Sequence, residues 1–251
     1  MVLMQLHPLT RYLAYQLYHA RIMLGTLSRE GGEEEVHAFR VALRRVRSLV
    51  KLYLKHILPF PAELKSAVRG TNTLRELDVL IGSLTPAEYP QTVKALKRMR
   101  REHLETLLRS DFAETTRKVL LEYCNDLCNA NPPLPAEKLL RRIEGHFTAS
   151  LEVYRSISVQ TRQKELHRLR IDFKNARYGF EFLRDEGIGE EDAKIAECKK
   201  IQNALGAVQD GYNQIEWLKK LYKHQPCEET KRLLKERKQG LKKLKAASRL
   251  G

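Results

Sequence analysis

The chain has 251 residues, with 46 Lys and Arg against 31 Asp and Glu, and so a formal net charge of +15. That length suits one large domain or two small ones, and the charge favours a polyanionic partner such as nucleic acid, polyphosphate or an acidic membrane surface. No apolar run approaches the roughly 18 residues that span a bilayer. The four cysteines lack a compact framework spacing and the start of the chain lacks a secretory leader, so we predict a cytoplasmic protein with free thiols.

Apolar residues recur with helical periodicity in the first half of the chain, and no segment alternates as a strand does. We predict helices over residues 10–27, from about 33 to before Pro59, over 62–84, from about 91 to a cap at Ser110-Asp111, and from there to about 128. The stretch SREGG at 28–32 is a predicted break, because two glycines in a row interrupt the pattern.

The clearest break in the chain is NANPPLP at 129–135, where two consecutive prolines stop any helix. We therefore divide one domain into an N-terminal half, 1–128, and a C-terminal half, 136–251, joined by this short and stiff linker. In the second half we predict helices over 136–156, 162–186, 190–223 and 228–249. The predicted fold class is all-α.

One predicted helix carries a row of basic residues along a single face. Counted at about 100° per residue, five side chains with spacings of 3, 4, 3 and 4 fall within about 80° of arc: His37, Arg40, Arg44, Arg47 and Lys51. An apolar row that includes Phe39 and Leu43 lies on the adjoining face. No acid occurs between residues 36 and 51, so we expect negative charge to come from outside this helix.

The same pattern recurs after a shift of 130 residues. The shift places the first row onto His167, Arg170, Lys174 and Arg177. The second copy is weaker, because Asn175 replaces Arg45 and Glu181 replaces Lys51. Two such rows suggest a duplicated unit in which each half contributes one wall of a shared site.

The paired H-x-x-R-x-x-x-[RK]-x-x-R helices resemble the CHAD domain, an all-helical family named for its histidines. TNTLRELDV at 71–79 is similar to that family's L-G-x-x-R-D-x-D-V motif, and LGAVQD at 205–210 to its counterpart. Asn72 departs from the usual Gly, and Glu76 from the usual Asp. The resemblance implies two pseudo-twofold-related bundles of about four helices each around a basic central channel. It also implies binding of inorganic polyphosphate without catalysis.

The candidate polyphosphate-binding residues are the two rows, the arginine beside the first row, and three cations from other helices. They are His37, Arg40, Arg44, Arg45, Arg47, Lys51, His167, Arg170, Lys174, Arg177, Arg11, Lys97 and Arg101. Lys97 and Arg101 belong to a second basic face with Lys94 and Arg98, for which a solvated exterior is an equal alternative. Each histidine either is neutral and gains a proton when polyphosphate arrives, or is hydrogen-bonded to a carboxylate that orients the helix.

Three further residues are assigned supporting roles. Asp78 and Asp210 are expected to pair with arginines of the motif and hold their rotamers. Arg75 has a neighbouring acid in Glu76, which favours a structural role. Cys124 and Cys128 lie four residues apart, but without a second His or Cys pair nearby we interpret them as core residues, and we expect neither a metal nor a cofactor.

Three other functions compete with polyphosphate binding. Phosphoryl transfer needs metal-holding carboxylates or a phosphate-binding loop, and the sequence shows no such motif, so we expect no enzyme activity. Nucleic-acid binding fits the charge, but aromatic residues are not interleaved with the basic rows. A helical scaffold for an acidic protein segment is the third alternative. Association with polyphosphate granules would follow from the first interpretation.

Overall fold

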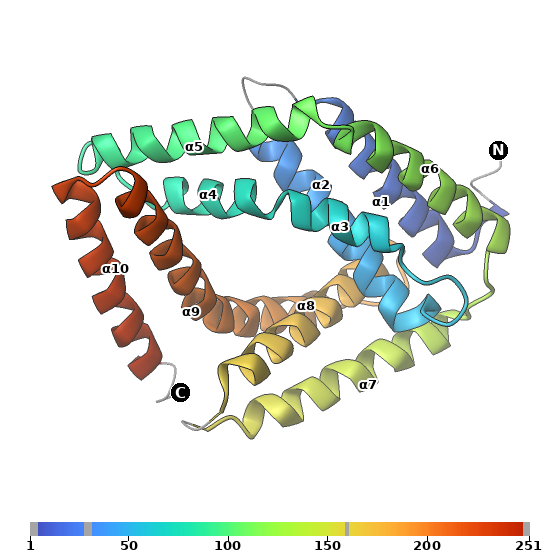
Figure 1. The fold of residues 1–251 in the computed structure, drawn as a ribbon. Helices are drawn as coiled ribbons and strands as arrows, with labels where there is room; N and C mark the ends of the chain where they lie inside the picture. The colour runs from blue at the N-terminus through green and yellow to red at the C-terminus, as the bar shows by residue number, and fades with distance from the viewer. Residues whose placement is uncertain (1–4, 28–31, 159–160, 248–251) are drawn as a thin grey trace.

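A computed structural model describes residues 5–27, 32–158 and 161–247, and this part of the chain is helical without a strand (Figure 1). The all-α prediction is confirmed. The first half contains α1 (Pro8–Gly25), α2 (Glu33–Leu49), a π-helical segment η2 (Val50–Leu54), α3 (Ala62–Gly70), α4 (Asn72–Gly82), α5 (Pro90–Arg109) and α6 (Phe112–Ala130). The second half contains α7 (Ala136–Arg155), α8 (Gln163–Asp185), α9 (Asp192–His224) and α10 (Glu228–Ala247).

The single helix predicted over residues 62–84 is wrong, because α3 and α4 are separate helices that meet at Thr71. The Thr71 side chain is fully buried and donates a hydrogen bond to the carbonyl of Val68 at 3.0 Å. A threonine hydroxyl that binds the backbone three residues earlier competes with the helical pattern. The predicted break at 28–32 falls almost wholly outside the described residues, and Gly32, with φ of 89°, directly precedes α2.

The apolar face of the basic helix α2 is buried as its periodicity predicts. Phe39, Leu43 and Val46 have no exposed surface, and Phe173 and Phe180 on α8 are buried in the same core. This core takes in helices of both halves, including α1, α2, α6, α7 and α8. The expected division into two bundles of about four helices therefore stays a prediction.

A second core joins α4 and α5 of the first half to α9 and α10 of the second. Its buried members include Leu80, Leu96, Trp217 and Leu233. The helices form an open frame in which α5 runs along the outside of α4, and α10 runs along the outside of α9 (Figure 1). This arrangement leaves α2, α4, α8 and α9 nearest the middle of the frame.

The predicted linker is short and well anchored. Asn131 ends α6 with φ of 29°, and its side-chain oxygen accepts a hydrogen bond from the backbone N–H of His7 at 2.9 Å. Leu134 is buried in the main core. The break thus lies at residues 131–135, slightly later than predicted. Among the helices of the described residues, none has the length and apolar character needed to cross a bilayer.

Candidate anion-binding site

The two basic helices, α2 and α8, pack against each other. The Ser48 hydroxyl donates to Oδ1 of Asn175 at 2.8 Å, and the Arg45 guanidinium lies over the ring of Tyr178 at 6.0 Å. A shift of 130 residues relates Ser48 to Tyr178 and Arg45 to Asn175. The contact between Ser48 and Asn175 is therefore equivalent to the contact between Tyr178 and Arg45. Contacts with this relationship are expected where two equivalent helices face each other across a twofold axis.

The basic rows meet in a cluster around Lys174. Burial and, after it, the positive charges of Arg44, Arg170, Arg177 and Arg40 together lower the pKa of the Lys174 ammonium to about 6. At neutral pH the amine is therefore largely uncharged in the free protein. Because crowded cations repel one another and are poorly solvated when buried, an arriving anion would relieve both costs.

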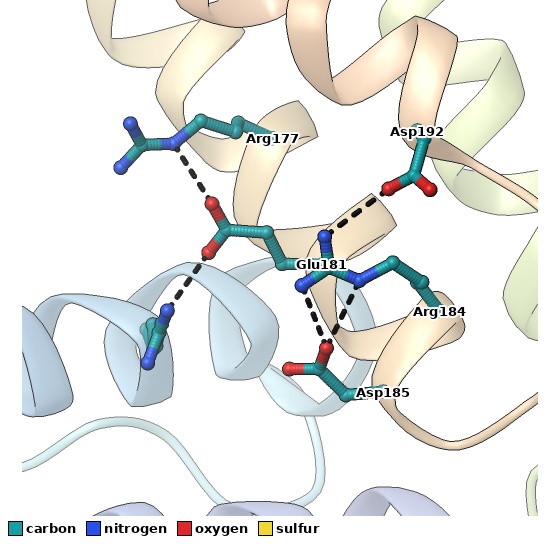
Figure 2. A network of polar contacts seen from close by, with 6 residues as sticks. Arg177, Glu181, Arg184, Asp185 and Asp192 are labelled. Carbon is teal, nitrogen blue, oxygen red and sulfur yellow. Dashed lines mark hydrogen bonds and ion pairs between the residues drawn. The ribbon is translucent and has the colours of Figure 1, made fainter.

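Some predicted binding residues are already neutralised by acids of the second half (Figure 2). Glu181, which is only 7% exposed, forms ion pairs with Arg45 at 3.1 Å and with Arg177 at 3.4 Å. One carboxylate thus occupies two arginines of the predicted site. Arg45 and Arg177 therefore contribute less free positive charge than the sequence suggests.

Two more predicted residues also have acidic partners. Arg11 pairs with Glu186 at the end of α8. Lys51 lies 3.9 Å from Asp172, although its side chain is 59% exposed. An exposed pair at this distance is weak, so Lys51 remains able to turn towards a ligand, whereas the interaction of Arg11 fastens α1 to α8.

Arg40 is bound mainly within the protein. Only 3% of the residue is exposed, and its Nη1 donates to the carbonyl of Val68 at 2.5 Å and to Oγ1 of Thr71 at 2.7 Å. Its Nη2 donates to Oδ1 of Asn72 at 2.8 Å. Burial lowers the pKa of Arg40 to about 9, with nearby Arg44 a further cause, so the group still carries its charge at neutral pH. The direct-binding role predicted for Arg40 is corrected to positioning, because the guanidinium stabilises the α3–α4 junction.

Five basic side chains of the two rows and of α4 have no partner within the described residues. Within the described residues, none of these side chains forms an ion pair or a hydrogen bond, and we call them the open cluster: Arg44, Arg47, Arg75, Lys174 and Arg170. Arg75 lowers the pKa of both Arg40 and Arg44 through its charge, so it faces the cluster from α4. Among the described residues it forms no ion pair with Glu76, which accepts a hydrogen bond from Nε1 of Trp217 at 2.9 Å, so the structural role expected for Arg75 stays a prediction.

The two motif aspartates do not hold the arginines of the basic rows. Asp78 is buried and forms its ion pair with Arg100 on α5, which lies outside the motif. Asp210 forms no ion pair with any described residue and lines a cavity beside α10. Both expected pairings are therefore corrected. Asp78 instead fastens α4 to α5, which fixes the helix that carries Arg75.

The two histidines have different surroundings. His37 is half-buried, and burial together with the charge of Arg75 lowers its pKa below the ordinary value of 6.5. Within the described part of the chain neither histidine is hydrogen-bonded to a carboxylate, so the orienting role proposed as one alternative is not observed. His167 is exposed on α8. His37 is therefore neutral at pH 7 in the free protein.

Lys97 and Arg101 are not brought to the open cluster. Both are exposed on α5, and they line a groove that contains no residue of α2 or α8. The cysteines Cys124, Cys128, Cys198 and Cys227 are free thiols. The described residues contain no group of three His, Cys, Asp or Glu side chains arranged to hold a metal ion.

Sequence reasoning missed two residues that shape the site. In the sequence, Glu181 marks only a loss of charge relative to Lys51, and no motif points to Arg100. Glu181 follows Arg177 by four residues on one helix, a spacing that does predict an ion pair. No sequence signal links Arg100 to Asp78, since the two residues come from different helices.

The fold and the basic cluster define an all-helical protein with a positively charged centre. A family model described as the CHAD domain matches residues 11–219, and the chain belongs to this family. The structure is also similar to the crystal structure of the CHAD domain from the plant Ricinus communis, with a TM-score of 0.75 and 18% sequence identity. The alignment covers 96% of this chain and 86% of that one, and at this identity the likeness concerns the fold alone. None of the curated proteins compared with the chain matches it.

Proposed function

We propose that this protein binds inorganic polyphosphate, without cleaving it, at the open cluster. The observation that carries the proposal is the set of five unpartnered cations contributed by α2, α4 and α8. The guanidinium groups of Arg44, Arg75 and Arg170 are partly buried and have no acidic partner among the described residues, so their positive charge is not balanced within the protein. A multivalent anion supplies the missing charge.

The chemistry of the cluster suits a linear chain of phosphates. The guanidinium groups of Arg44, Arg47, Arg75 and Arg170 offer paired N–H donors that match two phosphate oxygens, while the Lys174 ammonium is a point charge on a flexible stem. Because polyphosphate carries charge on every unit, neighbouring phosphates meet neighbouring cations. The helix spacing of three and four residues places these cations about one turn apart.

Binding without cleavage follows from the acids available. Phosphoryl transfer normally uses carboxylates that hold a metal or position a nucleophile. The carboxylate of Glu181 is instead occupied by Arg45 and Arg177. The cluster supplies electrostatic stabilisation only, and we extend the proposal to a cytoplasmic protein that accompanies polyphosphate granules.

Calorimetric titration with long-chain polyphosphate across a salt series tests the proposal. We expect tight binding that weakens steeply with salt, because each phosphate contact releases counterions. The double variant Arg44→Ala/Arg170→Ala should reduce the salt slope by about two, at roughly one unit per contact. The matched control is Arg141→Ala/Arg168→Ala, which removes the same charge from exposed positions on α7 and α8. Equal losses in both variants would show diffuse attraction to the net charge.

Two competitors separate polyphosphate from the other polyanions. DNA that displaces polyphosphate at equal phosphate concentration would favour a nucleic-acid binder. Phosphate-free polyglutamate of comparable affinity would favour a scaffold for acidic protein segments. We expect neither to compete well, because carboxylates and duplex backbones present their charges with a spacing and shape that differ from those of a flexible phosphate chain.

A further inference from the structure

A groove with basic lining residues lies beside α5. This groove of about 720 Å³ runs between this helix, the preceding loop and the end of α9. Small-molecule sites usually have volumes of about 300–1,000 Å³. The groove is lined by Pro86, Pro90, Gln91, Val93, Lys94, Ala95, Lys97, Arg98, Arg101 and Gln225.

The groove carries positive charge that the protein does not balance. Lys94, Lys97 and Arg101 are exposed and have no ion-pair partner among the described residues. Arg98 is occupied, since its Nη2 donates to Oε1 of Gln225 at 2.9 Å and its Nε lies 3.8 Å from Glu102. This contact ties α5 to the end of α9, and both of its residues line the groove. Three free cations therefore line a groove that a structural residue holds in shape.

The lining is not purely cationic. Pro86, Pro90, Val93 and Ala95 contribute apolar surface between the charged side chains. A bare phosphate chain gains nothing from apolar contact, whereas a ligand with an apolar body and an anionic end satisfies both parts of the groove. The exposed aliphatic rings of Pro86 and Pro90 offer apolar surface to the body of such a ligand.

The groove is separate from the open cluster. Its lining includes no residue of α2, α4 or α8. Helix α4 packs against α5 from the inside of the frame, and α5 lies on the outside (Figure 1). A ligand in the groove and a polyphosphate chain at the open cluster therefore contact different residues.

We propose that the α5 groove is a second ligand site, which binds a nucleotide-sized organic phosphate. The phosphates contact Lys94, Lys97 and Arg101, and the apolar body packs on Pro86 and Pro90. This site does not depend on the proposed function of the open cluster. Failure of polyphosphate binding at the cluster would leave the groove unaffected.

The test is calorimetric titration with ATP, adenosine and tripolyphosphate in the Arg44→Ala/Arg170→Ala background, which removes competition from the cluster. Into this background we introduce either Lys97→Ala/Arg101→Ala or the exposed control pair Lys138→Ala/Arg141→Ala on α7. We expect the groove pair to weaken ATP binding by at least about tenfold, since two charged contacts are lost. The control pair should leave ATP binding unchanged. Circular dichroism confirms that each variant is folded.

The ligand comparison tests the apolar part of the proposal. ATP should bind several-fold more tightly than tripolyphosphate, and adenosine should bind weakly or not at all. Absence of any heat with ATP would overturn the proposal, as would equal ATP affinity in the groove and control variants. Tripolyphosphate binding as tight as that of ATP would show that the apolar lining makes no contact.

Discussion

The guanidinium of Arg170 lies directly against Gly206 of the LGAVQD motif. A Cβ at Gly206 would be 3.1 Å from Nε of Arg170 and 3.4 Å from Nη2. In the first half, the residue that corresponds to Gly206 is Asn72, whose side chain accepts a hydrogen bond from Arg40. The two halves thus treat equivalent arginines differently. Arg40 is bound by an asparagine, whereas Arg170 packs on a glycine and keeps its donors free for a ligand.

Replacing Gly206 by Ala should separate binding from stability. Alanine favours the helix by up to about 1 kcal/mol, so we expect an unchanged or higher Tm. The new Cβ displaces the flexible end of Arg170 and should weaken polyphosphate binding several-fold. Thermal unfolding and calorimetry measure the two effects. The control is Gly145→Ala on α7, where an added Cβ meets nothing within 4 Å. A Gly206→Ala protein with full affinity would contradict a binding role for Arg170.

Replacing Arg40 by Met should mainly reduce stability. The change removes the three hydrogen bonds that Arg40 donates to the carbonyl of Val68 and to the side chains of Thr71 and Asn72, and we expect a loss on the order of 3 kcal/mol in the free energy of unfolding. The Val68 carbonyl keeps its hydrogen bond from the Thr71 hydroxyl. Urea denaturation gives this value. The exposed Arg47→Met should change stability by less than about 0.5 kcal/mol while lowering affinity. If the two variants lost similar stability, the three hydrogen bonds of Arg40 would not hold the α3–α4 junction.

Replacing Glu181 by Gln should have opposite effects on stability and binding. Loss of the carboxylate leaves Arg45 and Arg177 without an ionic partner and should destabilise the protein by about 2 kcal/mol. The two released guanidinium groups should strengthen polyphosphate binding and steepen its salt dependence. Denaturation and a salt-series titration test both signs. Glu152→Gln, at an exposed position on α7, removes the same charge and should leave both quantities nearly unchanged.

Lys174 should make stability and binding depend on pH. Its pKa is about 6 in the folded protein, against an ordinary 10.5, so the unfolded chain binds more protons between these values. Stability should therefore rise with pH through this window. Lys174→Met should flatten the rise, and the exposed Lys164→Met should not. A pH series of denaturation curves measures the difference between the variants.

Polyphosphate should return a proton to the same amine. A bound anion favours the ammonium form, so at pH 7.5 we expect proton uptake of up to about one per site. Titrations in buffers of different ionisation enthalpy measure this uptake, and affinity should fall as pH rises from 6 to 9. Lys174→Arg should take up fewer protons on binding than the wild type, because its guanidinium already carries its charge. Equal uptake by wild type and Lys174→Arg would place the proton elsewhere.

The sequence by itself determined the helical fold class and the two basic rows. Amphipathic periodicity is a local property, because a helix places residues three and four apart on one face whatever surrounds it. The burial of Phe39 and Phe173 beside their basic rows follows from that geometry. The shared spacing also relates Arg40 to Arg170 and Arg44 to Lys174.

Only the tertiary structure decided which of these cations are free. Periodicity places Arg40 and Arg44 in one row. Thr71 and Asn72, however, accept hydrogen bonds from Arg40 and not from Arg44. Glu181 reaches Arg45 because α8 packs on α2, a contact between residues far apart in the chain. Charge is neutralised by partners in space, and local sequence does not specify them. The open cluster is therefore a property of how α2, α4 and α8 pack together.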